Sequence, residues 1–175
     1  MKLLLFLIAT VMMLLTGCGK EAVLIPPVMP TDIITLADAQ NTTDGTYKLK
    51  LNYDAVVEIS DNVYRAEYLA DPLGSGDTVL VTVTSPYGSV TSNDIKEMYK
   101  SEYKARLNKK KVEGLGNGAF LVFPSLYIYN DGYMIEISAG SGNSDEQKEL
   151  LKRIGERAVM NFQRIITVDD TAENQ

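Results

Sequence analysis

The sequence of 175 residues contains no histidine and no tryptophan, and it contains a single cysteine. The absence of histidine excludes a Ser-His-Asp triad, a Cys-His nucleophile and any zinc or haem site that depends on histidine. A lone cysteine leaves the fold without an intramolecular disulfide, so packing must stabilise it. The remaining chemistry would rest on carboxylates, Lys, Tyr, Ser or a hard cation. We therefore expect a protein that is not an enzyme and that binds no cofactor or metal.

Basic residues are also few, since 17 Lys and Arg stand against 23 Asp and Glu, for a formal net charge of −6. An acidic chain without a basic stripe binds nucleic acid poorly, so we expect no nucleic-acid partner. The one basic cluster, Lys109 to Lys111, has two interpretations: a contact for an anionic partner, or the solvated end of a helix. The second is favoured because the run is short and the chain is acidic.

One long apolar run opens the chain. Met1 to Leu14 carries a single charge, Lys2, and small residues follow the run. The stretch from Leu3 to Leu15 is shorter than the roughly 20 apolar residues of a transmembrane helix. A positive start, an apolar core and small residues before a cleavage point are typical of a secretory signal peptide. The single cysteine, Cys18, comes directly after this segment.

The segment Leu15-Thr16-Gly17-Cys18 resembles the lipobox of bacterial lipoproteins. The resemblance implies cleavage before Cys18, diacylglycerol on its thiol, and acyl chains such as palmitate that hold the protein to the extracytoplasmic side of the bacterial cell membrane. It implies a lipoprotein signal peptide over residues 1–17. Residues 18–30 would then be a lipidated, proline-containing tether. The alternative is a transmembrane helix followed by an ordinary free cysteine. The tether either stays extended or docks in part on the domain through its apolar residues, Val23, Leu24, Ile25 and Val28.

Alternating apolar residues predict strands over residues 47–59, 63–69 and 78–84. The third pattern is the strongest, because it is β-branched nearly throughout and places Val79, Val81 and Val83 on one face.

Helical spacing predicts helices over residues 31–44, 91–107 and 144–165. Thr35 with Asp38, and Ser144 with Gln147, form capping-box patterns. The last helix carries a buried stripe of Leu150, Leu151, Ile154, Ala158, Phe162 and Ile165. Residues 168–175 form an acidic, polar tail that we expect to be disordered.

A hairpin is predicted over residues 126–138, because Asp131-Gly132 is a strong two-residue turn signal. Pairing Asn130 with Tyr133 makes one face of the hairpin entirely apolar, and that face holds Leu126, Ile128, Ile135 and Ile137. The opposite face holds Glu136 and a candidate contact patch of Tyr127, Tyr129 and Met134. The alternative is that a helix covers this second face.

Glycine is concentrated between Val112 and Phe120, with Gly-x-Gly-x-Gly spacing. This spacing is not a dinucleotide-binding fingerprint, because a strand follows it where a helix is required. It favours a structural turn whose glycines take positive φ.

Four residues of this turn, Gly114, Leu115, Gly116 and Ala119, resemble the Gly-Leu-Gly-Asp-x-Ala signature of small extracytoplasmic lipoprotein domains of Gram-positive bacteria. Asn117 stands where that family often has Asp, and residues 34–39 resemble the first helix of such domains. The resemblance implies a compact α+β domain and brings no catalytic residue.

The sequence thus predicts a single α+β domain over residues 31–167, with two or three helices packed on an antiparallel β-sheet. The predicted function is a lipid-anchored cell-envelope protein with a non-catalytic binding or adaptor domain, whose partner is an envelope protein or a small amphiphile. The alternatives are a carrier or sensor of a small amphiphile, a passive envelope component, or a histidine-independent enzyme. The acids that an enzyme or a hard-metal site would use are Asp61, Asp71, Asp77, Asp131 and Glu136, and none has the spacing of a known cation loop.

Overall fold

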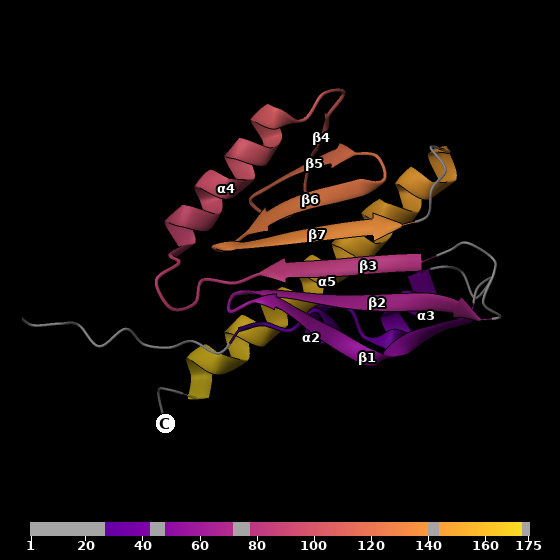
Figure 1. Ribbon diagram of the computed structural model, residues 1–175, viewed down its shortest axis with the longest axis horizontal. Helices are drawn as coiled ribbons and strands as arrows, with labels where there is room; N and C mark the ends of the chain where they lie inside the picture. Colours follow the sequence, from indigo (N-terminus) through magenta and orange to yellow (C-terminus); the bar gives the residue numbers. More distant parts are fainter. Residues whose placement is uncertain (1–26, 43–47, 72–77, 140–143, 173–175) are drawn as a thin grey trace, which may run out of the picture.

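The computed structural model describes residues 27–42, 48–71, 78–139 and 144–172, and within them it shows one antiparallel sheet (Figure 1). The sheet has seven strands in the order β1-β2-β3-β7-β6-β5-β4. The strands are β1 (Lys48–Ser60), β2 (Val63–Asp71), β3 (Thr78–Thr84), β4 (Lys110–Val112), β5 (Gly118–Val122), β6 (Ser125–Asn130) and β7 (Tyr133–Ala139). The helices are α2 (Pro30–Ile33), α3 (Leu36–Thr42), α4 (Ser92–Ala105) and α5 (Asp145–Ala172).

Two meanders meet in the middle of this sheet. Strands β1, β2 and β3 follow one another, and α4 then carries the chain to the far edge. From there β4 to β7 return inward until β7 pairs with β3, and every pairing is antiparallel. The predicted α+β class with an antiparallel sheet is therefore confirmed, while the described residues form four helices instead of two or three.

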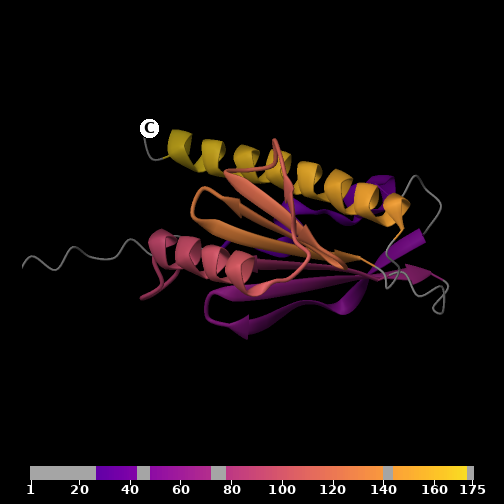
Figure 2. The ribbon, with the colours of Figure 1, turned by 90° about the horizontal axis from the view of Figure 1, so that it is seen from above.

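Helices lie on both faces of the sheet (Figure 2). On one face α5 packs on β6 and β7, and the short helices α2 and α3 pack against α5. The fully buried side chains between them come from alternate strand positions and from one stripe of α5; they include Val81, Val83, Ile135, Ile137, Leu151, Ile154, Ala158 and Phe162. This confirms the predicted buried faces of β3 and of the last helix. α4 lies on the opposite face, in contact with β6 and β7.

The hairpin of β6 and β7 has the predicted register. Asn130 pairs with Tyr133 and Ile128 pairs with Ile135 across the turn. Asp131 and Gly132 both take positive φ, 46° and 90°, as a two-residue hairpin turn requires.

The N-terminal part of the domain is more closely packed than predicted. The single helix expected over residues 31–44 is split at Ile34 and Thr35, because Thr35 caps α3 through a hydrogen bond from the Asp38 backbone at 3.1 Å. Val28 is buried, so the end of the predicted tether belongs to the domain core. Residues 18–26, which include Cys18 and the rest of the tether, lie outside the described residues.

Buried polar contacts fix these short helices. The Asn161 side-chain amide of α5 donates to the Ile33 carbonyl oxygen at 2.9 Å, and it also donates to Asp38 at 2.9 Å. The Tyr68 hydroxyl of β2 donates to the Ile34 carbonyl oxygen. α2 and α3 are thus attached to both α5 and the sheet.

The predicted C-terminal ends of two helices, α5 and α4, are wrong. α5 continues to Ala172, because no glycine or proline occurs after Gly155 to stop it, so residues 168–172 are helical and not part of a disordered tail. α4 ends at Ala105, and part of the basic cluster, Lys110 and Lys111, belongs to β4 instead of a helix end. Within the described ranges, no helix combines the length and the apolar character of a membrane span.

Candidate functional site

The tyrosine face predicted as a contact patch is covered by α4, as the alternative interpretation held. Tyr127 is only 4% exposed, and Tyr129 and Met134 are half-buried. The rings of Tyr99 and Tyr103 in α4 lie 5.3 and 5.2 Å from the ring of Phe120. Stacking continues from Phe120 to Tyr127 at 4.8 Å, and Tyr99 lies 5.8 Å from Tyr129. Of the two interpretations of this face, the covering helix is the one that the structure shows, because these aromatic rings pack into a second core layer.

The hydroxyl of Tyr127 joins the end of α4 to the sheet. Arg106 donates to it from the guanidinium at 3.0 Å, and the hydroxyl is also hydrogen-bonded to Glu136. Burial, followed by the nearby charge of Glu136, raises the pKa of Tyr127 to about 12. Tyr127 therefore stays protonated at neutral pH and acts as a structural contact.

The acids proposed for an enzyme or a hard-metal site lie at separate places. Asp61 and Asp131 are exposed in two different turns, whereas Glu136 is half-buried on the face under α4. The side chain of Asp71 and the whole of Asp77 lie outside the described residues. Among the residues that are described, no three acids or cysteines gather into a group that would hold a metal ion.

The glycine-rich segment after β4 forms the predicted structural turn. Gly114 and Gly116 have φ values of +73° and +57°, and the turn rests on the β6–β7 hairpin. The backbone N–H of Asn117 donates to the Tyr129 carbonyl oxygen at 2.9 Å, and the Asn117 side chain accepts from the backbone of Asp131 at 2.6 Å. Asn117 thus links the turn to the β6–β7 hairpin through both its backbone and its side chain.

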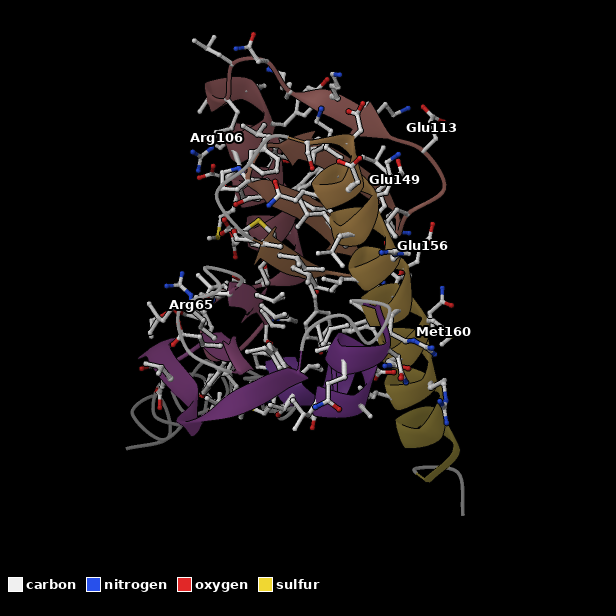
Figure 3. The ribbon with its side chains drawn as sticks, turned by 90° about the vertical axis from the view of Figure 1, so that its right-hand side faces the viewer. Arg65, Arg106, Glu113, Glu149, Glu156 and Met160 are labelled. Carbon is white, nitrogen blue, oxygen red and sulfur yellow. The ribbon has the colours of Figure 1, made fainter. Side chains whose placement is uncertain are left out.

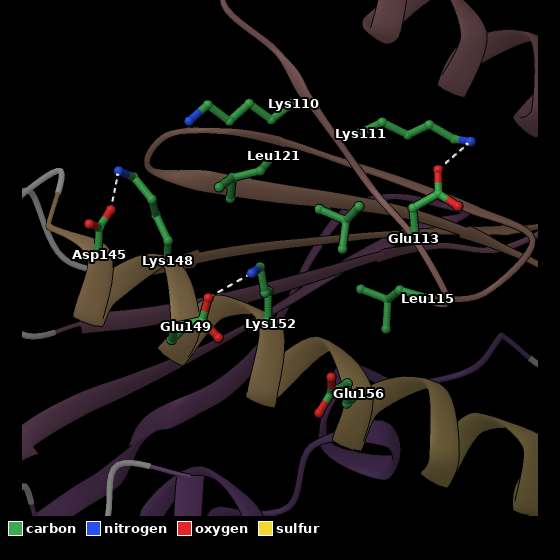
Figure 4. Close-up of a pocket in the computed structure, with 12 residues that line it drawn as sticks. Lys110, Lys111, Glu113, Leu115, Leu121, Asp145, Lys148, Glu149, Lys152 and Glu156 are labelled. Carbon is green, nitrogen blue, oxygen red and sulfur yellow. Dashed lines mark hydrogen bonds and ion pairs between the residues drawn. The ribbon is translucent and has the colours of Figure 1, made fainter.

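A groove that was not predicted lies between this turn, the edge strand β4 and the N-terminal half of α5. Its volume is about 590 Å³, and it is shown in close-up in Figure 4. Three apolar side chains line its floor: Val112 from β4, Leu115 from the turn, and Leu121 from β5. Leu115 and Leu121 are 4% and 5% exposed and Val112 is half-buried, so the floor presents only a small apolar surface.

Charged residues surround this floor, and three ion pairs lie along its two walls without crossing the groove. In α5, Lys148 lies 2.8 Å from Asp145, and Lys152 lies 2.6 Å from Glu149. Across the groove, Lys111 of β4 lies 2.8 Å from Glu113.

The pKa values of the rim residues reflect these ion pairs. The hydrogen bond from Lys148 lowers the pKa of Asp145, and that from Lys111 lowers the pKa of Glu113. Figure 3 shows Glu113 on the turn facing the same side of the molecule as Glu149 and Glu156 on α5.

Part of this groove had a signal in the sequence. Asp145, Lys148, Glu149, Lys152 and Glu156 follow one another at helical spacing, so they form a charged side next to the apolar stripe of α5. The opposite wall of the groove had no signal in the sequence, because the three residues of β4 are too few to show the alternation of apolar and polar residues that marks a strand.

The comparisons with known proteins place this chain in no family. No protein-family model, no curated protein and no solved structure matched it.

Proposed function

We propose that this chain is a lipid-anchored protein of the bacterial cell envelope, held to the membrane through Cys18, whose extracytoplasmic domain binds an envelope protein without catalysis. The observation that carries the binding role is the groove between β4 and α5, with its apolar floor and charged rim. Ligand sites are typically concave, apolar and supplied with a few polar groups that orient the ligand. The scattered positions of the candidate acids support binding over catalysis.

The shape of the groove favours a protein segment over a small amphiphile. The groove runs along the outer side of β4, which is the terminal strand of the sheet, and along several turns of α5. An amphiphile carrier would use an enclosed apolar cavity that covers most of the ligand. A surface groove with ion pairs on its rim suits an extended polypeptide, because its backbone and charges stay partly solvated.

The anchor is tested by fractionating the producing bacterium. Cys18→Ser should release the chain from the membrane fraction or leave it unprocessed, because no diacylglycerol can be attached. A matched serine substitution at Gly17, directly before the cleavage point, keeps the thiol and should keep the chain in the membrane. Membrane retention of a fully processed Cys18→Ser chain would contradict lipid anchoring.

The binding role is tested by crosslinking in the same cells. A photoreactive amino acid replaces Lys111 on the groove rim, or Glu58 of β1 at the opposite edge of the sheet as the control. We expect a crosslinked product from position 111 alone, and mass spectrometry of that product should map the attachment to one segment of an envelope protein. Equal labelling from both positions, or no product from position 111, would refute the groove as the binding site.

A further inference from the structure

The groove between β4 and α5 has uneven charge along its length. Three of its four lysines are neutralised by the ion pairs Lys111–Glu113, Lys148–Asp145 and Lys152–Glu149. Lys110 and Glu156 also line the groove, both are exposed, and neither forms an ion pair within the part of the chain that the structure describes. The three pairs are electrically balanced, and one charge of each sign remains unpaired among the residues that line the groove.

The two remaining charges lie toward opposite ends of the groove (Figure 4). Lys110 is near the start of α5, because its positive charge contributes to the lowered pKa of Asp145, after the larger effect of Lys148. Glu156 lies further along α5, on the side of Leu115. Asp145 and Glu156 are separated by about 16 Å along the helix axis at 1.5 Å per residue. An extended peptide covers this distance with about five residues.

We propose that the occupant of the groove is an extended peptide segment of about five residues, with an anionic group at the Lys110 end, a cationic group at the Glu156 end and apolar residues between them. This inference rests on the proposed binding role of the groove and specifies its partner. Complementary charge sets the orientation of the peptide, and Val112, the half-buried side chain of the floor, contacts its middle.

A second copy of this chain is a poorer occupant. β4 is only three residues long and carries two lysines, and short, lysine-bearing edge strands protect a sheet against pairing with another sheet. The charge separation across the groove instead favours a single peptide whose ends differ in sign.

The test uses the full-length protein in detergent and three dye-labelled peptides with blocked termini: Lys-Val-Leu-Val-Glu, Lys-Val-Leu-Val-Lys and Glu-Val-Leu-Val-Glu. Fluorescence anisotropy at low salt measures each Kd. The wild-type protein should bind the first peptide about fivefold more tightly than either same-sign peptide, since each exposed charge pair contributes up to about a fivefold change.

Charge reversals then switch the preference. Lys110→Glu leaves two acids at the ends and should prefer the peptide with two lysines, whereas Glu156→Lys should prefer the peptide with two glutamates. Lys104→Glu in α4 and Glu58→Lys in β1 make the same charge changes away from the groove and should leave the wild-type preference unchanged. Both groove residues are exposed, so each variant should melt at the wild-type temperature.

Equal binding of the three peptides, binding of none, or an unchanged preference in both groove variants would overturn the peptide assignment. The crosslinking experiment at position 111 separates this failure from failure of the binding role. If position 111 is crosslinked but the three peptides bind equally, the groove remains a binding site for a different partner segment. If position 111 is not crosslinked and the peptides show no preference, both proposals are refuted.

Discussion

Replacing Gly116 by alanine tests whether the turn after β4 depends on its close approach to the β6–β7 hairpin. A Cβ atom at Gly116 would lie 2.8 Å from the carbonyl oxygen of Tyr129. That oxygen already accepts the hydrogen bond from the backbone of Asn117. Because the obstacle is backbone, the methyl group fits only if the turn moves away from β6.

Two costs add at this position. The left-handed conformation of Gly116 costs a residue with a side chain about 1–2 kcal/mol. Moving the turn breaks the hydrogen bond from Asn117 to Tyr129 and weakens that from Asp131 to Asn117, each worth about 1 kcal/mol. Gly116→Ala should therefore lower the free energy of unfolding by about 2–4 kcal/mol and the Tm by roughly 4–16 °C.

Gly114→Ala is the matched control. Gly114 also has positive φ, but no atom outside its chain neighbours lies within 4 Å of the added Cβ. Only the conformational cost of about 1–2 kcal/mol remains. Urea denaturation of the full-length chain in detergent, followed by circular dichroism, measures both variants. Equal losses of stability at the two glycines would refute the argument that the turn is held by close contact with β6.

Three further predictions concern polar contacts. Asn161→Ala should cost about 1–3 kcal/mol by leaving the Ile33 carbonyl oxygen buried without its donor, and hydrogen exchange should then speed up in residues 30–42 before the sheet opens. Thr91→Ala should destabilise by about 1 kcal/mol through loss of the α4 cap. It should also raise the pKa of Asp94, which the hydrogen bond from Thr91 now lowers, as an NMR titration would detect. Finally, the pKa of Tyr127 is about 12 in the folded state and about 10 in the unfolded state. The contribution of its burial to stability is therefore complete below pH 10 and is lost as the pH rises toward 12. Tyr127→Phe should flatten this decline in the free energy of unfolding, as urea titrations at several pH values would measure.

Local patterns in the sequence were enough to predict the regular parts of the fold. The Asp131-Gly132 turn determines the register of β6 and β7, because a two-residue loop leaves only one pairing that puts Ile128 and Ile135 on the same face. The stripe of α5 follows from helical spacing, and the Ser144 side chain accepts from the backbone of Gln147 at 3.2 Å, as the cap pattern predicted. These features depend on residues that are close in the chain.

Features that depend on distant residues were not predicted. The insertion of β7 beside β3 joins residues 50 to 60 positions apart, such as Val81 and Ile137, and no local pattern identifies that pairing. The face of Tyr127 and Tyr129 had two interpretations because its exposure depends on α4, whose Tyr99 and Tyr103 rings cover it. The groove was not predicted because its two walls, β4 and α5, meet only in the folded chain.

The position of the groove follows from how α5 packs on the sheet. α5 lies against β6 and β7, where Gly155 allows a close approach: a Cβ atom there would lie 2.7 Å from a methyl group of Leu126. β5 and β4 lie beside the helix instead of directly under it, and β4 is too short to fill the remaining space. The Lys and Glu side chains of α5 beside this space form ion pairs with one another along the helix, as Lys152 does with Glu149, and none of these pairs reaches across to β4. The same packing that holds a disulfide-free domain together therefore also creates its candidate binding site.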